Sequence, residues 1–192
     1  MRSKIGIALA LCVTVATALV AQVAAPPTIK PDDSAAFKEF SKRVQTYMTL
    51  RKTVESGMPA LKPTDLPEMI SAYQQALARK IREARPHAEV GDVFTSDVRE
   101  AFRHVSAAPL VGPHAATRKD MERDAPSPQM RLLVNGTYPD SEPNTPLSPA
   151  LLKAFPPLPD ELAYRVVGRT LILLDVKSRL IVDFARLILP PA

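Results

Sequence analysis

The chain has 192 residues, of which 20 are proline, one is cysteine and none is tryptophan, and its 25 Lys and Arg residues against 20 Asp and Glu residues give a net charge of +5. This proline content excludes a single uninterrupted helical bundle and a long coiled coil, because each interior proline removes a backbone donor and clashes with the preceding turn. A single cysteine excludes an internal disulfide framework and any multi-cysteine zinc or iron–sulfur site.

The first 25 residues have the pattern of a secretory signal peptide. Arg2 and Lys4 precede an apolar run over residues 5–20, which is followed by a short stretch of small residues. This order is typical of a cleaved signal, with the cut after Ala21 or Ala25. A retained membrane anchor is the alternative, because the run approaches the ~18 residues that can span a bilayer. Since no basic residues follow the run, we expect cleavage and a periplasmic or secreted protein without a stable membrane span.

Cys12 lies inside the apolar run and is preceded by Leu11. A lipoprotein signal would need a small residue before the cysteine and would end its apolar region there, so we do not expect lipidation. Cleavage after Ala25 removes two basic residues and the cysteine, and leaves 167 residues with a net charge of +3. A chain of this length without disulfides must be stabilised by its own core.

Two amphipathic helices are predicted next, over residues 33–56 and 65–85. Gly57 ends the first, Asp65 supplies a capping oxygen to the second, and Pro86 ends the second. Their short connection predicts an antiparallel helical hairpin with the apolar stripes facing each other. The stripes consist of Phe37, Phe40, Val44, Tyr47, Met48 and Val54 in the first helix and of Leu66, Met69, Ile70, Tyr73, Leu77 and Ile81 in the second.

A third, shorter helix is predicted to begin at a cap formed by Thr95 or Ser96 and to end near Ala107. One face of it carries Val98, Phe102 and Val105. Residues 109–128 are polar, and we interpret them as a connector that contains one short helix at 116–123.

The remaining chain is rich in β-branched residues. Short runs over residues 162–167, 170–176 and 180–184 are separated by two- and three-residue connections, which predicts an antiparallel meander with one buried face. Residues 130–134, just before Asn135–Gly136, are a candidate fourth strand.

The predicted fold class is therefore α+β. A helical region over residues 26–108, with a helical hairpin and a third helix, is followed by a connector at 109–128. A small β-rich region of three or four strands at 129–192 packs against the helices, so that both regions form one domain.

The chain lacks the spacings of the common catalytic and cofactor sites. It contains neither a Gly-x-Ser-x-Gly elbow nor a glycine-rich phosphate loop, so no cofactor is expected. Its three histidines, His87, His104 and His114, are not spaced as a helical zinc motif, but they could converge with Asp92 or Asp97 on a metal ion. A metal-assisted hydrolase is therefore one alternative function.

The helical hairpin carries most of the excess positive charge. Binding to an anionic envelope surface is a second alternative, although an ordinary solvated face explains the same residues. Nucleic acid is not an expected partner, because aromatic side chains do not alternate with the basic ones. The basic residues are Lys42, Arg43, Arg51, Lys52, Arg79, Lys80, Arg82 and Arg85.

Four charged residues accompany the predicted strands, namely Arg165, Arg169, Asp175 and Asp183. They could form cross-strand ion pairs that fix the register, or they could form an interaction surface for a partner. The sequence does not separate these two interpretations.

The strand motifs resemble the C-terminal part of a family of uncharacterised exported bacterial proteins. The resemblance implies a location in a Gram-negative-type envelope and carries no activity or site residue with it. It rests on Tyr164-Arg165-x-Val167-Gly168-Arg169-x-Leu171, Leu174-Asp175-Val176 and Leu180-Ile181-Val182-Asp183, with Gly91-Asp92-Val93-Phe94-Thr95 and Val134-Asn135-Gly136-Thr137-Tyr138-Pro139 upstream.

Together these features predict a non-enzymatic exported protein that acts through an interaction surface on the small sheet or on the helical hairpin. The expected partner is a protein of the cell envelope. The sequence predicts no oligomeric state.

Overall fold

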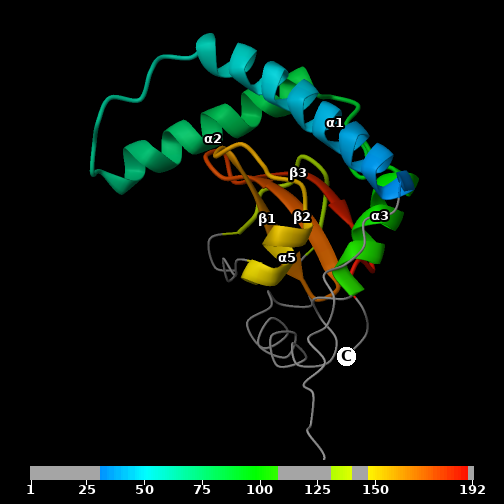
Figure 1. Ribbon diagram of the computed structural model, residues 1–192. Coiled ribbons are helices and arrows are strands. Elements are labelled where there is room, and N and C mark those ends of the chain that lie inside the picture. Colours follow the sequence, from blue (N-terminus) through cyan, green and yellow to red (C-terminus); the bar gives the residue numbers. More distant parts are fainter. Residues whose placement is uncertain (1–30, 108–130, 140–146, 190–192) are drawn as a thin grey trace, which may run out of the picture.

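The computed structural model describes residues 31–107, 131–139 and 147–189, and it confirms the α+β class (Figure 1). The predicted signal peptide and the predicted helix at 116–123 lie outside the described residues. Helices occupy the N-terminal half, and an antiparallel sheet follows. The elements are α1 (Pro31–Ser56), α2 (Pro67–Ala84), α3 (Ser96–Ala107), α5 (Pro149–Ala154), β1 (Leu162–Val167), β2 (Thr170–Asp175) and β3 (Leu180–Ala185).

The described sheet has three strands in the order β1-β2-β3, and both pairs are antiparallel, as predicted. Gly168, in the two-residue turn between β1 and β2, has φ +57°, a conformation that glycine adopts without strain. The second turn contains Arg179 with φ 51°. The register between β2 and β3 shifts between Leu173 and Leu174.

The predicted fourth strand before Asn135 is wrong over its described residues. A turn closed by the hydrogen bond from Gly136 N to Leu133 O (2.9 Å) redirects the chain, and Asn135 takes φ 60°. The residues after this turn, not those before it, therefore run along β3. Thr137 and Leu180 form an isolated antiparallel bridge, and this segment covers the outer edge of β3.

Both faces of β2 and β3 are buried, whereas the alternating pattern predicts one buried face, and only β1 alternates. One face packs against α1, α3 and α5 and contributes to the main core. The other face carries a smaller cluster beneath residues 131–139, which explains why β2 and β3 are almost continuously apolar. The smaller cluster contains Tyr138, Ile172, Leu174, Ile181 and Phe184.

An aromatic cluster joins the helices to the sheet. Phe102 of α3 lies 5.0 Å from Phe40 of α1 and 4.7 Å from Phe155 just after α5, measured between ring centroids. Tyr164 of β1 lies 5.4 Å from Phe155. Edge-to-face rings at these separations are favourable. The helical and β-rich regions therefore share one core.

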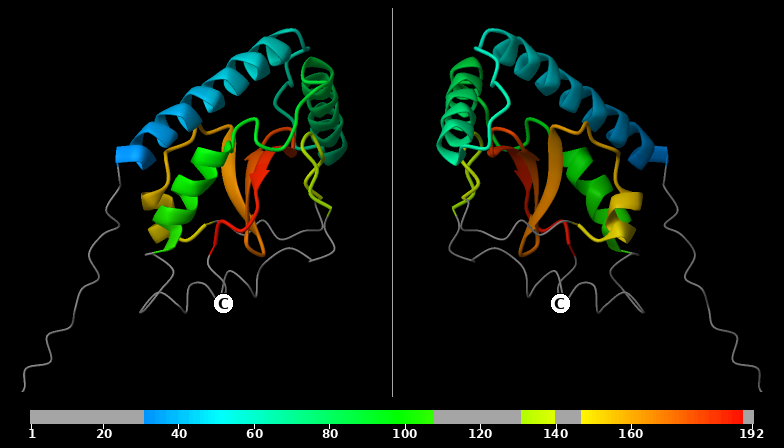
Figure 2. Two further views of the ribbon diagram at one scale, coloured as in Figure 1. Left: turned by 90° about the vertical axis from the view of Figure 1, so that its right-hand side faces the viewer. Right: turned by 90° about the vertical axis from the view of Figure 1, so that its left-hand side faces the viewer.

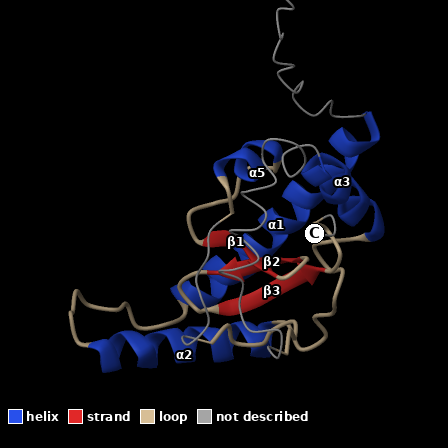
Figure 3. Cartoon of the chain, turned by 90° about the horizontal axis from the view of Figure 1, so that it is seen from below, coloured by secondary structure: helices blue, strands red, loops and turns tan. Residues whose placement is uncertain are grey.

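Helices α1 and α2 cross steeply and splay apart toward the loop between them (Figure 2). The C-terminal half of α2 lies beside the sheet, and its N-terminal half extends beyond the sheet (Figure 3). No helix in the described ranges is long and apolar enough to cross a membrane.

Candidate interaction surface

A buried carboxylate connects α1 to the sheet. Asp175, at the end of β2, has no exposed surface. Its Oδ2 accepts hydrogen bonds from Tyr47 Oη at 2.8 Å and from Arg51 Nε at 2.6 Å, while its Oδ1 accepts one from Ser178 N at 3.0 Å. Tyr47 and Arg51 are one helical turn apart, so the two side chains reach the same carboxylate from one face of α1.

This cluster continues to the protein surface through Glu55, one turn further along α1. Glu55 accepts hydrogen bonds from Arg51 Nη1 at 2.7 Å and from Tyr73 Oη of α2 at 3.1 Å. Lys177, in the turn between β2 and β3, binds the same carboxylate. One side chain of α1 therefore contacts both α2 and the sheet turn.

The ionisation of these groups suits a structural role. Burial and the neighbouring carboxylate of Asp175 raise the pKa of Tyr47 far above its usual value, so this hydroxyl stays protonated. Partial burial opposes ionisation of Glu55, but the hydrogen bond from Lys177 and the charge of Arg51 lower its pKa overall. The cluster thus holds fixed charges rather than a group poised for proton transfer near neutral pH.

Asp183 of β3 holds the loop between α2 and α3. Its carboxylate accepts backbone hydrogen bonds from Val93 N and Phe94 N, both at 2.8 Å, and from Gly91 N at 3.1 Å. Burial raises the pKa of Asp183, while these backbone donors and Phe184 N work against the rise. Gly91 has φ +100°, which lets its N–H turn toward the carboxylate.

The two strand aspartates therefore do not form the cross-strand ion pairs predicted for them. Asp175 pairs with Arg51 and Asp183 with backbone donors, because both carboxylates point into the core and are fully buried. For the same reason they cannot contribute to a surface for a partner. Arg165 and Arg169 are only partly buried, and they donate hydrogen bonds to the backbone carbonyls of Tyr164 and Leu189.

The described histidines do not come together. His104 lies on α3, where its Nδ1 is 2.7 Å from Oδ2 of Asp33 of α1, and His87 is exposed in the loop after α2. His114 lies outside the described residues. Asp92 contacts Arg85, and Asp97 contacts Ser96. Within residues 31–107, 131–139 and 147–189, no group of three His, Cys, Asp or Glu side chains could hold a metal ion.

Much of the basic charge on α1 and α2 is used inside the protein. Arg51 is buried against Asp175, and Arg43 donates to Glu39 and to the carbonyl of Asp92. Arg82 and Arg85 bind residues 135–137, which fixes this segment on α2. The predicted basic face is therefore not one continuous cationic surface.

An acidic hollow of about 500 Å³ lies between α1 and α3. Three of the carboxylates that line it already have partners, since Asp33 binds His104, Glu39 binds Arg43 and Glu100 binds Arg103. Of these three pairs, only Asp33–His104 joins the two helices, while the other two lie within one helix each.

The apolar stripe of α2 is covered over only half of its length. Leu77 and Ile81 are fully buried in the core. Leu66, Met69 and Ile70 continue the same stripe toward the helix start, yet they are 51%, 48% and 36% exposed. We refer to residues 66–73 as the α2 tip. The sequence pattern predicted that these residues are buried in the core. Apolar spacing shows which residues share one face of a helix, but it does not show whether another element covers that face.

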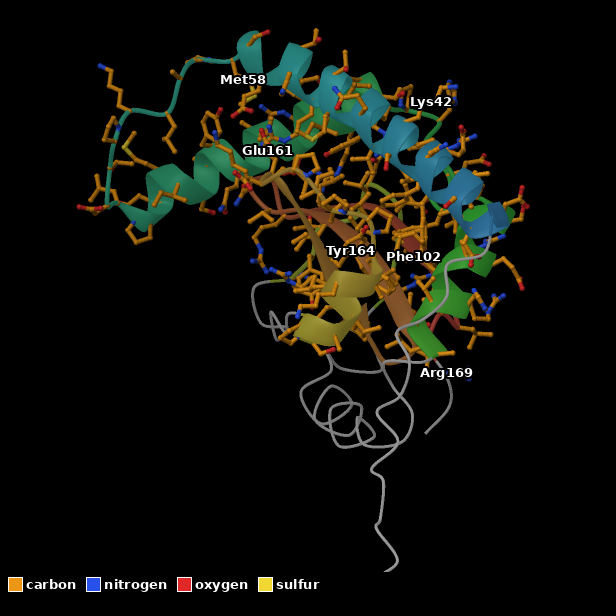
Figure 4. The ribbon with its side chains drawn as sticks, viewed as in Figure 1. Lys42, Met58, Phe102, Glu161, Tyr164 and Arg169 are labelled. Atoms are coloured by element: carbon orange, nitrogen blue, oxygen red, sulfur yellow. The ribbon has the colours of Figure 1, made fainter. Side chains whose placement is uncertain are left out.

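The α2 tip ends at Tyr73, where it meets the rest of the protein. Lys177 Nζ lies 4.8 Å from the centre of the Tyr73 ring, and the adjacent Val176 is 41% exposed. Val176 N donates to Glu161 O at 2.9 Å, which places the start of β1 at the same end of the sheet. Figure 4 labels Glu161 at the start of β1 and Met58 at the end of α1. The α2 tip and the acidic residue at the start of β1 thus lie toward the same end of the sheet.

Comparisons with known proteins give no match, neither to a family model, nor to a curated protein, nor to a solved structure. The function must therefore be argued from the geometry of this chain.

Replacing Asp183 by asparagine should destabilise the protein by about 2–4 kcal/mol, because one acceptor oxygen becomes an NH2 group that faces buried N–H donors. Urea unfolding of Asp183→Asn against the exposed control Asp160→Asn measures the difference. Equal stability of the two variants would show that the carboxylate does not hold the loop.

Glu55→Gln should lower the free energy of unfolding by a pH-dependent amount. Because the folded protein lowers the pKa of Glu55, its contribution is fully present above the unfolded pKa of about 4.3 and fades as the pH falls through the folded pKa. Unfolding is measured at pH 7 and at about pH 3, with exposed Glu68→Gln as the control. The gap in unfolding free energy between Glu55→Gln and the unchanged protein should narrow in acid. A gap that widens in acid would contradict this assignment.

Proposed function

We propose that this chain is an exported, non-enzymatic protein of the bacterial cell envelope that binds a partner protein through the α2 tip. The observation that carries the proposal is the uncovered half of the α2 stripe, where Leu66, Met69 and Ile70 are exposed side by side. Contiguous exposed apolar residues of this kind mark interaction sites more often than single ones do. Export is supported by the pattern of the first 25 residues.

The α2 tip has the properties of a docking element. Burying a Leu, Ile or Met side chain completely is worth roughly 1.5–3 kcal/mol, and these three are about half exposed, so covering them would yield a few kcal/mol. Tyr73 and the buried residues behind it fix the direction of the helix. The exposed side chains are therefore held in place, which lowers the entropy lost on binding.

A catalytic function has less support. The groups with perturbed pKa values, such as Tyr47 and Glu55, serve contacts between elements. His104, a candidate metal ligand, is held by Asp33 of α1, and His87 lies in the loop after α2. Binding to an anionic surface also has less support, because Arg51, Arg82 and Arg85 make internal contacts.

Site-specific photocrosslinking in living cells tests the proposal. A photoreactive amino acid in place of Met69 should give one discrete protein adduct in the envelope fraction, because this side chain lies at the proposed contact. The same amino acid in place of Gln75, exposed on another face of α2, should give none.

Ile70→Asp, introduced beside the photoreactive residue, should abolish the adduct, because a carboxylate in the contact carries a large desolvation cost. Adducts of equal yield at positions 69 and 75, or no adduct at 69, would refute the proposed surface. An adduct found only in the cytoplasmic fraction would refute the proposed location.

A further inference from the structure

We infer that the segment docking on the α2 tip is an amphipathic helix that carries basic side chains next to its apolar stripe. This inference rests on the proposed function and specifies the chemistry of the partner. It follows from the shape of the exposed stripe and from the charges around it.

The exposed side chains follow a helical ridge. Leu66, Ile70 and Tyr73 recur at spacings of four and three residues, and Met69 lies beside them. Residues at these spacings form the rows that pack into the grooves of a second helix. The row continues into Leu77 and Ile81 of the core, so an incoming helix would extend a packing surface that the protein already uses. Helices that present apolar residues at this spacing are a common recognition element.

The charged groups near this ridge are mainly acidic. Asp65 precedes α2, while Asp160 and Glu161 lie in the turn that leads into β1, at the end of the sheet where Lys177 of the β2–β3 turn contacts Tyr73. Within the described ranges, none of these three carboxylates makes an ion pair. They are therefore available to charges on a partner.

The basic groups of this region offset the acids only in part. Lys177 is held by Glu55 and by the ring of Tyr73, and Lys80 further along α2 lies 3.4 Å from Glu83. Lys62 is exposed in the loop before α2. The whole chain carries a net charge of +5, so a basic partner is not attracted by the overall charge. Electrostatic attraction of a basic partner would therefore have to come from this local group of carboxylates.

Two synthetic peptides of 18 residues test the inference on the protein purified as cells produce it. Both present leucine on one helical face, and the polar face carries lysine in one and glutamate in the other. Fluorescence anisotropy should show that the lysine peptide binds about tenfold tighter than the glutamate peptide at about 50 mM salt. This difference in affinity should become smaller at about 500 mM salt, because salt screens the charges.

Variants then assign the binding to the surface. The double variant Asp65→Asn with Glu161→Gln should weaken the lysine peptide about fivefold and should not weaken the glutamate peptide, since rim charges contribute modestly and these two repel an acidic peptide. The matched control, Asp97→Asn with Glu100→Gln on α3, should change neither affinity. Ile70→Ser should weaken both peptides, because the apolar contact is common to them.

Tighter binding of the glutamate peptide, or equal weakening by the control variant, would overturn the inference. So would binding of the α2 tip to phosphatidylglycerol vesicles that the lysine peptide does not displace, since the surface would then be membrane-directed. These failures differ from failure of the proposed function. A discrete adduct at position 69 together with a preference for the glutamate peptide leaves a protein partner but rejects its basic character.

Discussion

The fold depends on the contact of one buried carboxylate with one helix. Asp175 ends β2 inside the core, and Tyr47 and Arg51 of α1 both bind its Oδ2. Removing one partner of a buried charge pair leaves the other charge uncompensated and costs several kcal/mol, so these contacts restrict how α1 can lie across the sheet. Helices α2 and α3 both pack on α1, and their positions follow from its orientation.

The same cluster determines where α2 stops being supported. The cluster continues from Arg51 to Glu55, and Glu55 contacts Tyr73 and Lys177. At the other end of α2, Arg82 and Arg85 bind residues 135–137. The helix is thus attached from Tyr73 onward. The turns before Tyr73 extend past the sheet and keep the apolar residues that a fully covered helix would bury (Figure 3). The candidate interaction surface is therefore a consequence of how the ion pairs position α1 and α2.

Periodicity and turn residues were sufficient to predict α1, α2, α3 and the three strands, because these signals are local, whereas the short helix α5 was not predicted. The partners of Asp175 and Asp183 could not be predicted, since Arg51 lies 124 residues from the first, and Phe94 lies 89 residues from the second. A strand-end aspartate has no sequence signal for a distant arginine or for backbone donors. The exposure of Leu66 escaped prediction for a related reason. Apolar spacing predicts a stripe, and only the tertiary arrangement decides which half of it is covered.

Hydrogen exchange along α2, in the protein alone and in its crosslinked complex, tests the central claim most directly. The account predicts that amides of residues 70–72 exchange about tenfold or more faster than those of 77–81 in the protein alone, because this part of the tip lacks tertiary cover. In the complex the tip amides should become protected, while those of 77–81 stay unchanged. Equal protection of both halves in the protein alone, or no change in the tip on binding, would contradict the account.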